Sequence, residues 1–166
     1  MPAAGSEIKQ KMGALLAVDL GLTTGLALYD RCGKLRWYRS QHYSNMARLR
    51  RAIHGLVGSI PDLEFVLLEG GGDIADLWER EASRRGITVK RVSAETWRRH
   101  ILYPREQRSG SAAKNRSRDL ARGIVEWSGI RLLKSLRHDT AEAILIGLWG
   151  ALQMGWLDRL PQALRH

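Results

Sequence analysis

The sequence has only one cysteine, Cys32, and no apolar run long enough to cross a membrane. A single cysteine cannot form an intramolecular disulfide, and no histidine or second cysteine stands at a zinc-ligand spacing from it. A membrane span needs about 20 consecutive apolar residues, and the first apolar run, residues 14–18, is too short even for the core of a signal peptide. These absences exclude a disulfide-stapled secreted domain and an integral membrane protein, and we expect an intracellular location.

Acidic residues are scarce relative to basic ones. The chain has 17 Asp and Glu residues against 27 Lys and Arg residues, which gives a net charge of +10 and a pI near 10.5. Such an excess favours a polyanionic partner, and nucleic acid is the first candidate. No segment pairs a wide apolar helical face with a basic one, so the sequence does not predict a helix that lies on a membrane surface.

The length of 166 residues fits one domain with a single core. Residues 1–12 lack any hydrophobic period and predict a flexible basic arm. Residues 13–157 predict the folded domain, and residues 158–166 predict a C-terminal tail.

Hydrophobic patterning and turn residues predict alternating strands and helices. The expected strands are residues 14–18, 26–29, 35–39, 65–68 and 87–92. The expected helices are residues 45–59, residues 73–85 with Asp73 as the N-cap, a short helix after residue 93, a helix that begins near residue 113, and a last helix from about residue 137 to residue 155. Hairpin connections make the first three strands antiparallel, and a strand, helix, strand unit makes the last two parallel. The sequence therefore predicts an α/β fold with a mixed five-stranded sheet flanked by helices, which is the RNase H-like arrangement.

Acidic residues fall where such a fold brings side chains together. Asp19 ends the first strand, Glu69 ends the fourth, and Asp139 and Glu142 lie close together on the last helix. Adjacent parallel strands end at the same edge of a sheet, and residues three apart share a helix face. Four carboxylates at one place repel one another unless cations neutralise them, and their hard oxygen atoms favour Mg²⁺ or Mn²⁺. Two such ions, about 4 Å apart, would activate water and stabilise the leaving 3′ oxygen in phosphodiester hydrolysis.

Structural roles remain open for some of these residues. Asp19 precedes a glycine-rich turn, where aspartate is common, and Asp139 would stabilise a helix N-terminus by its charge. Glu142 stands at the position of a capping-box glutamate. Glu69 is harder to explain by structure, because it ends an apolar strand and precedes three glycines with no cation nearby in the sequence. Only the combination of the four favours the metal site.

Three segments together resemble the RuvC-like family of Holliday junction resolvases, including its phage, poxviral and organellar branches. They are residues 17–25, 67–70 and 137–146, and the resemblance extends over about residues 14–152. It implies metal-ligating and catalytic roles for Asp19, Glu69, Asp139 and Glu142, with two Mg²⁺ ions for each active site. It also implies that Lys114 approaches the scissile phosphate, although a solvated lysine at a helix start is an equally good interpretation.

The resemblance further implies a homodimer that binds branched DNA and cuts a four-way junction by paired symmetric hydrolysis. The helix over residues 73–85 is the candidate dimer surface. The chain departs from the family at Glu142, where aspartate is commoner, and at the glycines of residues 70–72.

Residues 98–122 contain eight Lys and Arg residues but only two acidic residues, Glu106 and Asp119. We expect this segment to position the phosphate backbone of DNA near the carboxylates. Trp97, directly before this segment, and Tyr103, within it, are candidates for stacking on splayed bases. The predicted nucleic-acid-binding cations are Arg98, Arg99, Arg105, Arg108, Lys114, Arg116, Arg118 and Arg122.

Four other residues have less specific expectations. Trp127, Trp149 and Trp156 fit helix faces and are expected in the core or in an interface. His138 would either assist the metal site directly or support a ligand from behind.

Two alternatives to a junction resolvase remain from the sequence. One is a different RNase H-like nuclease that acts on RNA or RNA–DNA hybrids. The other is a RuvC-related module that binds nucleic acid without cleaving it. The first motif also resembles the phosphate-binding loop of actin-like ATPases and sugar kinases, but those proteins need two such domains, for which 166 residues are too few.

Overall fold

A five-stranded mixed sheet forms the centre of the computed structural model, which describes residues 12–102, 110–132 and 135–165. The strand order is β3-β2-β1-β4-β5. The first three strands are antiparallel, and β4 is parallel to both β1 and β5, as predicted. The strands are β1 (Ala14–Asp19), β2 (Thr23–Asp30), β3 (Leu35–His42), β4 (Leu63–Glu69) and β5 (Thr88–Val92).

The central strand β1 is apolar from Ala14 to Val18 because both of its faces are covered. Leu15 and Ala17 belong to one hydrophobic cluster, and Leu16 and Val18 belong to the cluster on the other face. All of them are fully buried. A continuous apolar run of this length is typical of a strand buried on both sides rather than of an edge strand.

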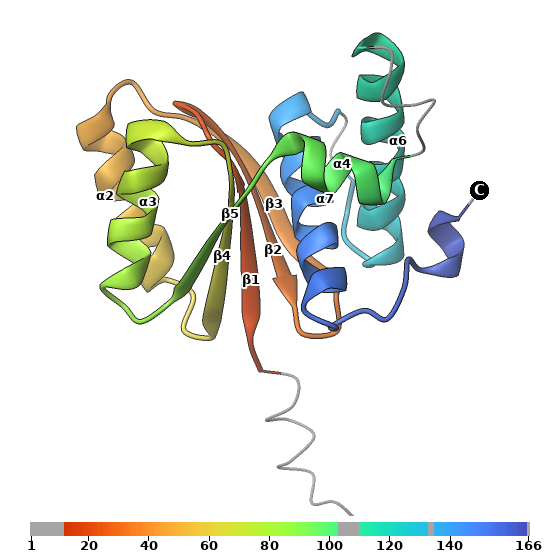
Figure 1. Cartoon of the computed structure of the whole chain (residues 1–166), viewed down its shortest axis with the longest axis horizontal. Coiled ribbons are helices and arrows are strands. Elements are labelled where there is room, and N and C mark those ends of the chain that lie inside the picture. Colours follow the sequence, from red (N-terminus) through yellow and green to blue (C-terminus); the bar gives the residue numbers. More distant parts are fainter. Residues whose placement is uncertain (1–11, 103–109, 133–134, 166) are drawn as a thin grey trace, which may run out of the picture.

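Helices cover the two faces of the sheet unequally (Figure 1). One face carries α2 (Met46–Gly58) and α3 (Gly72–Ser83). The other face carries α7 (His138–Gln153), with α4 (Ala94–Ile101) and α6 (Gly110–Trp127) beside it, and the short helix η1 (Gln162–Leu164) packs near α6. Within the described ranges, no helix is both long and apolar enough to cross a membrane.

Helix α7 packs directly against β2, and two features allow the close approach. A Cβ atom on Gly25 would lie 2.0 Å from the carbonyl oxygen of Asp139, so only glycine fits there. The Tyr29 hydroxyl, buried in the core, donates a hydrogen bond to the carbonyl oxygen of Ile144 at 2.5 Å. These contacts fix the distance between β2 and the N-terminal half of α7. They therefore determine where the acidic residues of α7 lie relative to the sheet.

The structure corrects one predicted detail of α3. The helix begins at Gly72 with Gly71 as its N-cap, and no side chain caps it. Asp73 lies in the first turn instead, so the prediction that Asp73 is the cap was wrong. The positive φ of Gly72, 74°, shows that the glycines make the turn from β4 into the helix.

The chain ends are only partly covered by the described ranges. The predicted basic arm lies outside them except for Met12. In the segment predicted as a tail, Leu164 is buried in the same hydrophobic cluster as α6. Trp149 and Trp156 pack against that cluster, as expected for core tryptophans, and Trp127 is half-buried beneath the ammonium group of Lys34.

Candidate active site

Asp19 and Glu69 are register partners in the parallel pair β1–β4. Both stand at the last position of their strands, and the backbone N–H of Leu20 donates to the carbonyl oxygen of Glu69 at 3.2 Å, which keeps the two strand ends together. Both residues are half-buried. The predicted placement of these two residues side by side at one edge of the sheet is therefore observed.

Asp139 and Glu142 lie in the first turns of α7, on the face of the sheet that α7 covers. Glu142 is only 3% exposed, whereas Asp139 is half-buried. Both negative charges act on Asp19 and raise its pKa, so all four acidic residues share one electrostatic environment. Helix α7 thus adds its acidic residues to the pair from the strands.

The pKa values in this site are shifted toward the neutral acid. Burial, followed by the charges of Glu69, Glu142 and Asp139, raises the pKa of Asp19 to about 7. Burial also raises the pKa of Glu69 and of Glu142, although the Trp97 N–H opposes the rise for Glu69 and the Arg98 charge opposes it for Glu142. Such mutual shifts are typical of carboxylates that share a site and lack sufficient positive charge.

Two adjacent residues of α4 contact two different carboxylates. Trp97 donates its indole N–H to Oε2 of Glu69 at 3.0 Å. Arg98 donates from Nη2 to Oε2 of Glu142, also at 3.0 Å, and its guanidinium lies 5.2 Å from the centre of the Trp97 ring. Helix α4 therefore links the strand-end carboxylate to the helical one.

Asp139 and Glu142 have further partners around the site. Ser40 on β3 donates its hydroxyl to Oδ2 of Asp139 at 2.5 Å, and the Arg137 Nε lies 3.6 Å from Oδ1. His138 Nε2 lies 3.6 Å from Oε1 of Glu142. Burial and the nearby positive charges lower the pKa of His138, so its imidazole is predominantly neutral at physiological pH.

The donor chemistry of the site fits a divalent cation, but its present geometry does not enclose one. Carboxylate oxygens are the ligands that Mg²⁺ and Mn²⁺ prefer, and a cation would relieve the repulsion that raises the pKa of Asp19. Within the described ranges, however, no three Asp, Glu, His or Cys side chains are grouped so that they could hold an ion. Glu142 and Asp139 are instead turned to Arg98 and Ser40.

The structure places the predicted nucleic-acid-binding cations at different distances from this site. Lys114 and Arg118 lie on α6 and are exposed, and their charges add to burial in lowering the pKa of His138, which precedes Asp139. The charge of Lys114 also opposes the rise in the pKa of Glu142, so Lys114 acts on the carboxylate site itself. Arg99 is also exposed, but it pairs with Glu95 on its own helix. Arg116 lies on the same helix as Lys114 and is half-buried.

Three residues of the predicted DNA surface, Arg105, Arg108 and Tyr103, lie outside the described residues.

The prediction that Trp97 stacks on a splayed base was wrong. Its side chain is fully buried in the hydrophobic cluster beneath α7, so no ring face is available to a base. The polar edge of the indole serves Glu69 instead. Burial of a tryptophan with its N–H paired is common, and the position of Trp97 between basic residues in the sequence concealed it.

Ser40 was not identified from the sequence at all. It lies opposite Gly25 in the β2–β3 pair, next to the point where α7 begins its contact with the sheet. Its partner, Asp139, is 99 positions away in the chain. No local motif marks a serine in this role, and only the packing of α7 across β2 reveals it.

No protein-family model and no curated protein sequence matches this chain. Among solved structures, Thermus thermophilus RuvC in complex with a Holliday junction substrate is similar, with a TM-score of 0.56 and 16% sequence identity over 86% of this chain and 96% of that chain. The catalytic core domain of BIV integrase is similar with a TM-score of 0.36 and 12% identity over 82% of this chain and 81% of that one. The likeness to RuvC establishes the RNase H-like fold. It confirms the predicted fold class, and the predicted resemblance to RuvC holds over most of the chain at the level of structure.

Proposed function

We propose that this chain is a metal-dependent DNA endonuclease that resolves four-way junctions by paired symmetric phosphodiester hydrolysis. The observation that carries the proposal is the register pairing of Asp19 with Glu69, with Glu142 and Asp139 of α7 acting on the same electrostatic site. The RNase H-like fold supports it, since RuvC, which has been solved with a Holliday junction substrate, shares that fold. The net charge of +10 is positive, as expected for a protein that binds the phosphate backbone of DNA.

The proposed metal ligands are Asp19, Glu69, Asp139 and Glu142, and Mg²⁺, with Mn²⁺ as a substitute, is the proposed cofactor, with two ions for each site. When bound, such ions supply positive charge at the reacting phosphate and increase the acidity of a water molecule. The protein itself contributes orientation. Trp97 fixes the Glu69 carboxylate, and Arg98 neutralises part of the Glu142 charge until a cation is present.

The proposed DNA surface runs along α4 and α6 beside the carboxylates. Lys114 and Arg118 are exposed there and would neutralise backbone phosphates, with Lys114 proposed to approach the scissile phosphate. We propose the same backbone role for Arg98, Arg99 and Arg116. Contacts of this kind position the strand but do not read its sequence. Selection of a four-way junction would therefore depend on its shape.

Paired symmetric cuts require two active sites, and we propose a homodimer for this reason. The proposed dimer surface is α3, which lies on the face of the sheet opposite α7 (Figure 1). Analytical ultracentrifugation at several concentrations tests the oligomeric state directly.

The proposed function is tested by incubating the protein with a labelled four-way junction, a matched duplex and an RNA–DNA hybrid, each with Mg²⁺ or with EDTA. We expect cleavage of the junction in Mg²⁺ only, lost by at least about 100-fold in Asp19→Asn and Glu69→Gln while junction binding persists. Cleavage of the plain duplex as fast as that of the junction would contradict the proposal that the protein selects four-way junctions. Preferred cleavage of the hybrid would identify the RNA–DNA alternative, and undiminished cleavage by either variant would remove the carboxylates from the mechanism.

A further inference from the structure

Helices α2 and α3 lie on the face of the sheet opposite α7 (Figure 1). A cleft is lined by residues of both helices. Its volume is about 590 Å³. The cleft thus belongs to a different layer of the fold from the carboxylates of α7. Its α3 wall is part of the proposed dimer surface, but its α2 wall, which carries Arg50 and Arg51, has no role in the proposed function. Its lining residues are Ala47, Arg50, Arg51, His54, Glu81 and Arg84.

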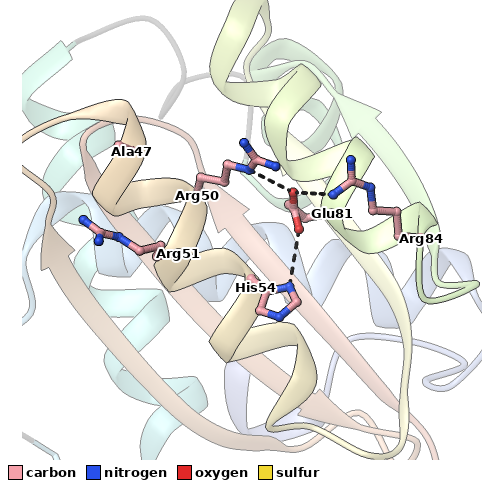
Figure 2. A pocket seen from close by; sticks show the side chains of 6 residues that line it. All are labelled: Ala47, Arg50, Arg51, His54, Glu81 and Arg84. Atoms are coloured by element: carbon pink, nitrogen blue, oxygen red, sulfur yellow. Dashed lines mark hydrogen bonds and ion pairs between the residues drawn. The ribbon is translucent and has the colours of Figure 1, made fainter.

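Glu81 forms the anionic floor of this cleft and is only 4% exposed (Figure 2). Its Oε1 lies 3.5 Å from Nε of Arg50 and 3.3 Å from Nη1 of Arg84, and its Oε2 lies 3.6 Å from Nδ1 of His54. A buried carboxylate requires such partners, because an unpaired buried charge is strongly destabilising. Glu81 therefore holds cationic side chains from both helices at the mouth of the cleft.

Positive charge nevertheless exceeds what Glu81 neutralises. The side chains of Arg50 and Arg84 remain 57% and 58% exposed, although both approach Glu81. Each guanidinium carries several N–H donors in a fixed fork, more than one carboxylate shared among three partners can accept. Arg51 adds a third guanidinium, which points away from Glu81 in Figure 2.

The sequence of α2 strengthens this excess. The helix contains three arginines and one histidine but no acidic residue, so Glu81 of α3 supplies its negative partner in this cleft. The result is an accessible groove that offers guanidinium donors to an anion from both of its walls.

We propose that the α2–α3 cleft is a second nucleic-acid contact, which binds phosphate groups of a DNA backbone away from the carboxylate site. Guanidinium groups match phosphate oxygens through paired N–H donors, and the +10 charge of the chain favours a polyanion over a small neutral ligand. The inference relies on the DNA-binding part of the proposed function, but not on cleavage. A four-way junction has several arms, and a contact on this layer would hold an arm that the catalytic layer does not reach.

The test measures binding of a plain labelled duplex by fluorescence anisotropy in EDTA, as a function of salt concentration. We expect the double variant Arg50→Gln/Arg51→Gln to reduce the slope of log affinity against log salt by about 1.8, and Arg51→Gln alone to reduce it by about 0.9. Both variants retain Arg84 and His54 as partners of Glu81, which protects the fold. The matched control, Lys90→Gln/Arg159→Gln, also removes two exposed positive charges, but from outside the cleft.

A slope in the cleft variants equal to that of the control would overturn the proposal. So would a change in sedimentation without a change in DNA binding, which would identify the cleft as a protein interface. Inorganic phosphate could instead stabilise the wild type, but not the cleft variants, against thermal unfolding. If the salt dependence of DNA binding were then the same in the wild type and the variants, the cleft would be a site for a small anion. This experiment measures binding and not cleavage, so its result does not depend on the proposed nuclease activity. If the protein binds DNA through the cleft but does not cut a junction, the proposal for the cleft stands and the proposed function is contradicted.

Discussion

Asp19 and Glu69 stand side by side at the ends of two parallel strands, and burial together with the negative charge of Glu69 raises the pKa of Asp19. Two carboxylates in such positions destabilise the fold when both are ionised. The chain retains this unfavourable pair at the one edge of the sheet where α7 brings two more acidic residues. Electrostatic strain of this kind is typical of a site that binds cations rather than of one that stabilises the fold.

Replacement of Asp19 by asparagine should therefore stabilise the metal-free protein at neutral and higher pH. The pKa of Asp19 is raised from 3.8 to about 7, so the folded state keeps a proton that the unfolded state has released. The wild type should thus lose stability as the pH rises from about 4 to above 7. At pH near 8 we expect Asp19→Asn to be more stable by about 2 kcal/mol, after allowance for solvent screening. Urea unfolding in EDTA across this pH range measures the effect.

The difference between the two proteins should nearly vanish near pH 4, where both carry a neutral side chain at this position. Addition of Mg²⁺ should stabilise the wild type more than the variant, since the cation replaces the lost proton. A variant that is less stable than the wild type at every pH would contradict the electrostatic account of Asp19.

The hydrogen bond from Trp97 to Glu69 gives a second prediction. In the wild type, the indole N–H of Trp97 lowers the pKa of Glu69. Trp97→Phe keeps most of the buried area but removes this N–H, so the pKa of Glu69 should rise. We expect a loss of about 2 kcal/mol in stability and a roughly tenfold loss of junction cleavage. The loss of stability should be larger at high pH than at low pH, because the N–H stabilises the ionised carboxylate.

Trp78→Phe is the matched control for Trp97. Trp78 is also buried, at 1% exposure, but it lies in the other hydrophobic cluster and its Nε1 has no hydrogen-bond partner among the described residues. This variant should lose stability without pH dependence and should cleave like the wild type. If both variants lose cleavage equally, Trp97 acts only through packing.

Much of the fold follows from local patterns that the sequence displays. The apolar run of β1 and the turn at Asp30 predict strands because a doubly buried strand and a hairpin each have a short-range signal. The acidic positions Asp19 and Glu69 were predictable for the same reason, since each ends such a strand. Their adjacency needed only the assumption that β1 and β4 are parallel neighbours, which the structure confirms.

The partners of the acidic residues could not be predicted in this way. Glu69 and Trp97 are 28 positions apart, and Glu142 and Arg98 are 44 apart, so their contacts depend on how α4 packs beside α7. Composition favoured a DNA-binding role for Trp97, because basic residues surround it in the sequence. Trp97 is buried in the structure, so it cannot stack on a base. Whether a given tryptophan is buried depends on tertiary packing, which a local sequence pattern does not predict.

Arg98 gives a third prediction, about competition for Glu142. The guanidinium opposes the rise in the pKa of Glu142 and occupies Oε2, one of the oxygens proposed to bind a cation. Arg98→Gln should lower the thermal stability in EDTA, because it leaves a buried carboxylate less neutralised. It should also increase Mg²⁺ affinity about tenfold, equivalent to about 1.4 kcal/mol, as measured by the Mg²⁺ dependence of the melting temperature.

Arg99→Gln controls for the removal of a positive charge from α4. Arg99 pairs with the exposed Glu95, so its loss should leave both stability and Mg²⁺ affinity nearly unchanged. Equal Mg²⁺ affinity in Arg98→Gln and the wild type would show that Arg98 does not compete with a cation at Glu142.

Gly25 gives the last prediction, because it sets the distance between β2 and α7. A Cβ atom at this position would lie 2.0 Å from the Asp139 carbonyl oxygen, which is backbone and cannot rotate away. Gly25→Ala must therefore displace the first turn of α7, and with it the Asp139 carboxylate that Ser40 holds. We expect a loss of about 2–3 kcal/mol in stability and a loss of cleavage of roughly 100-fold. Gly71→Ala is the control, since its Cβ would meet no atom and its φ of −154° suits alanine. Normal cleavage by Gly25→Ala would show that the position of α7 is not critical for the site.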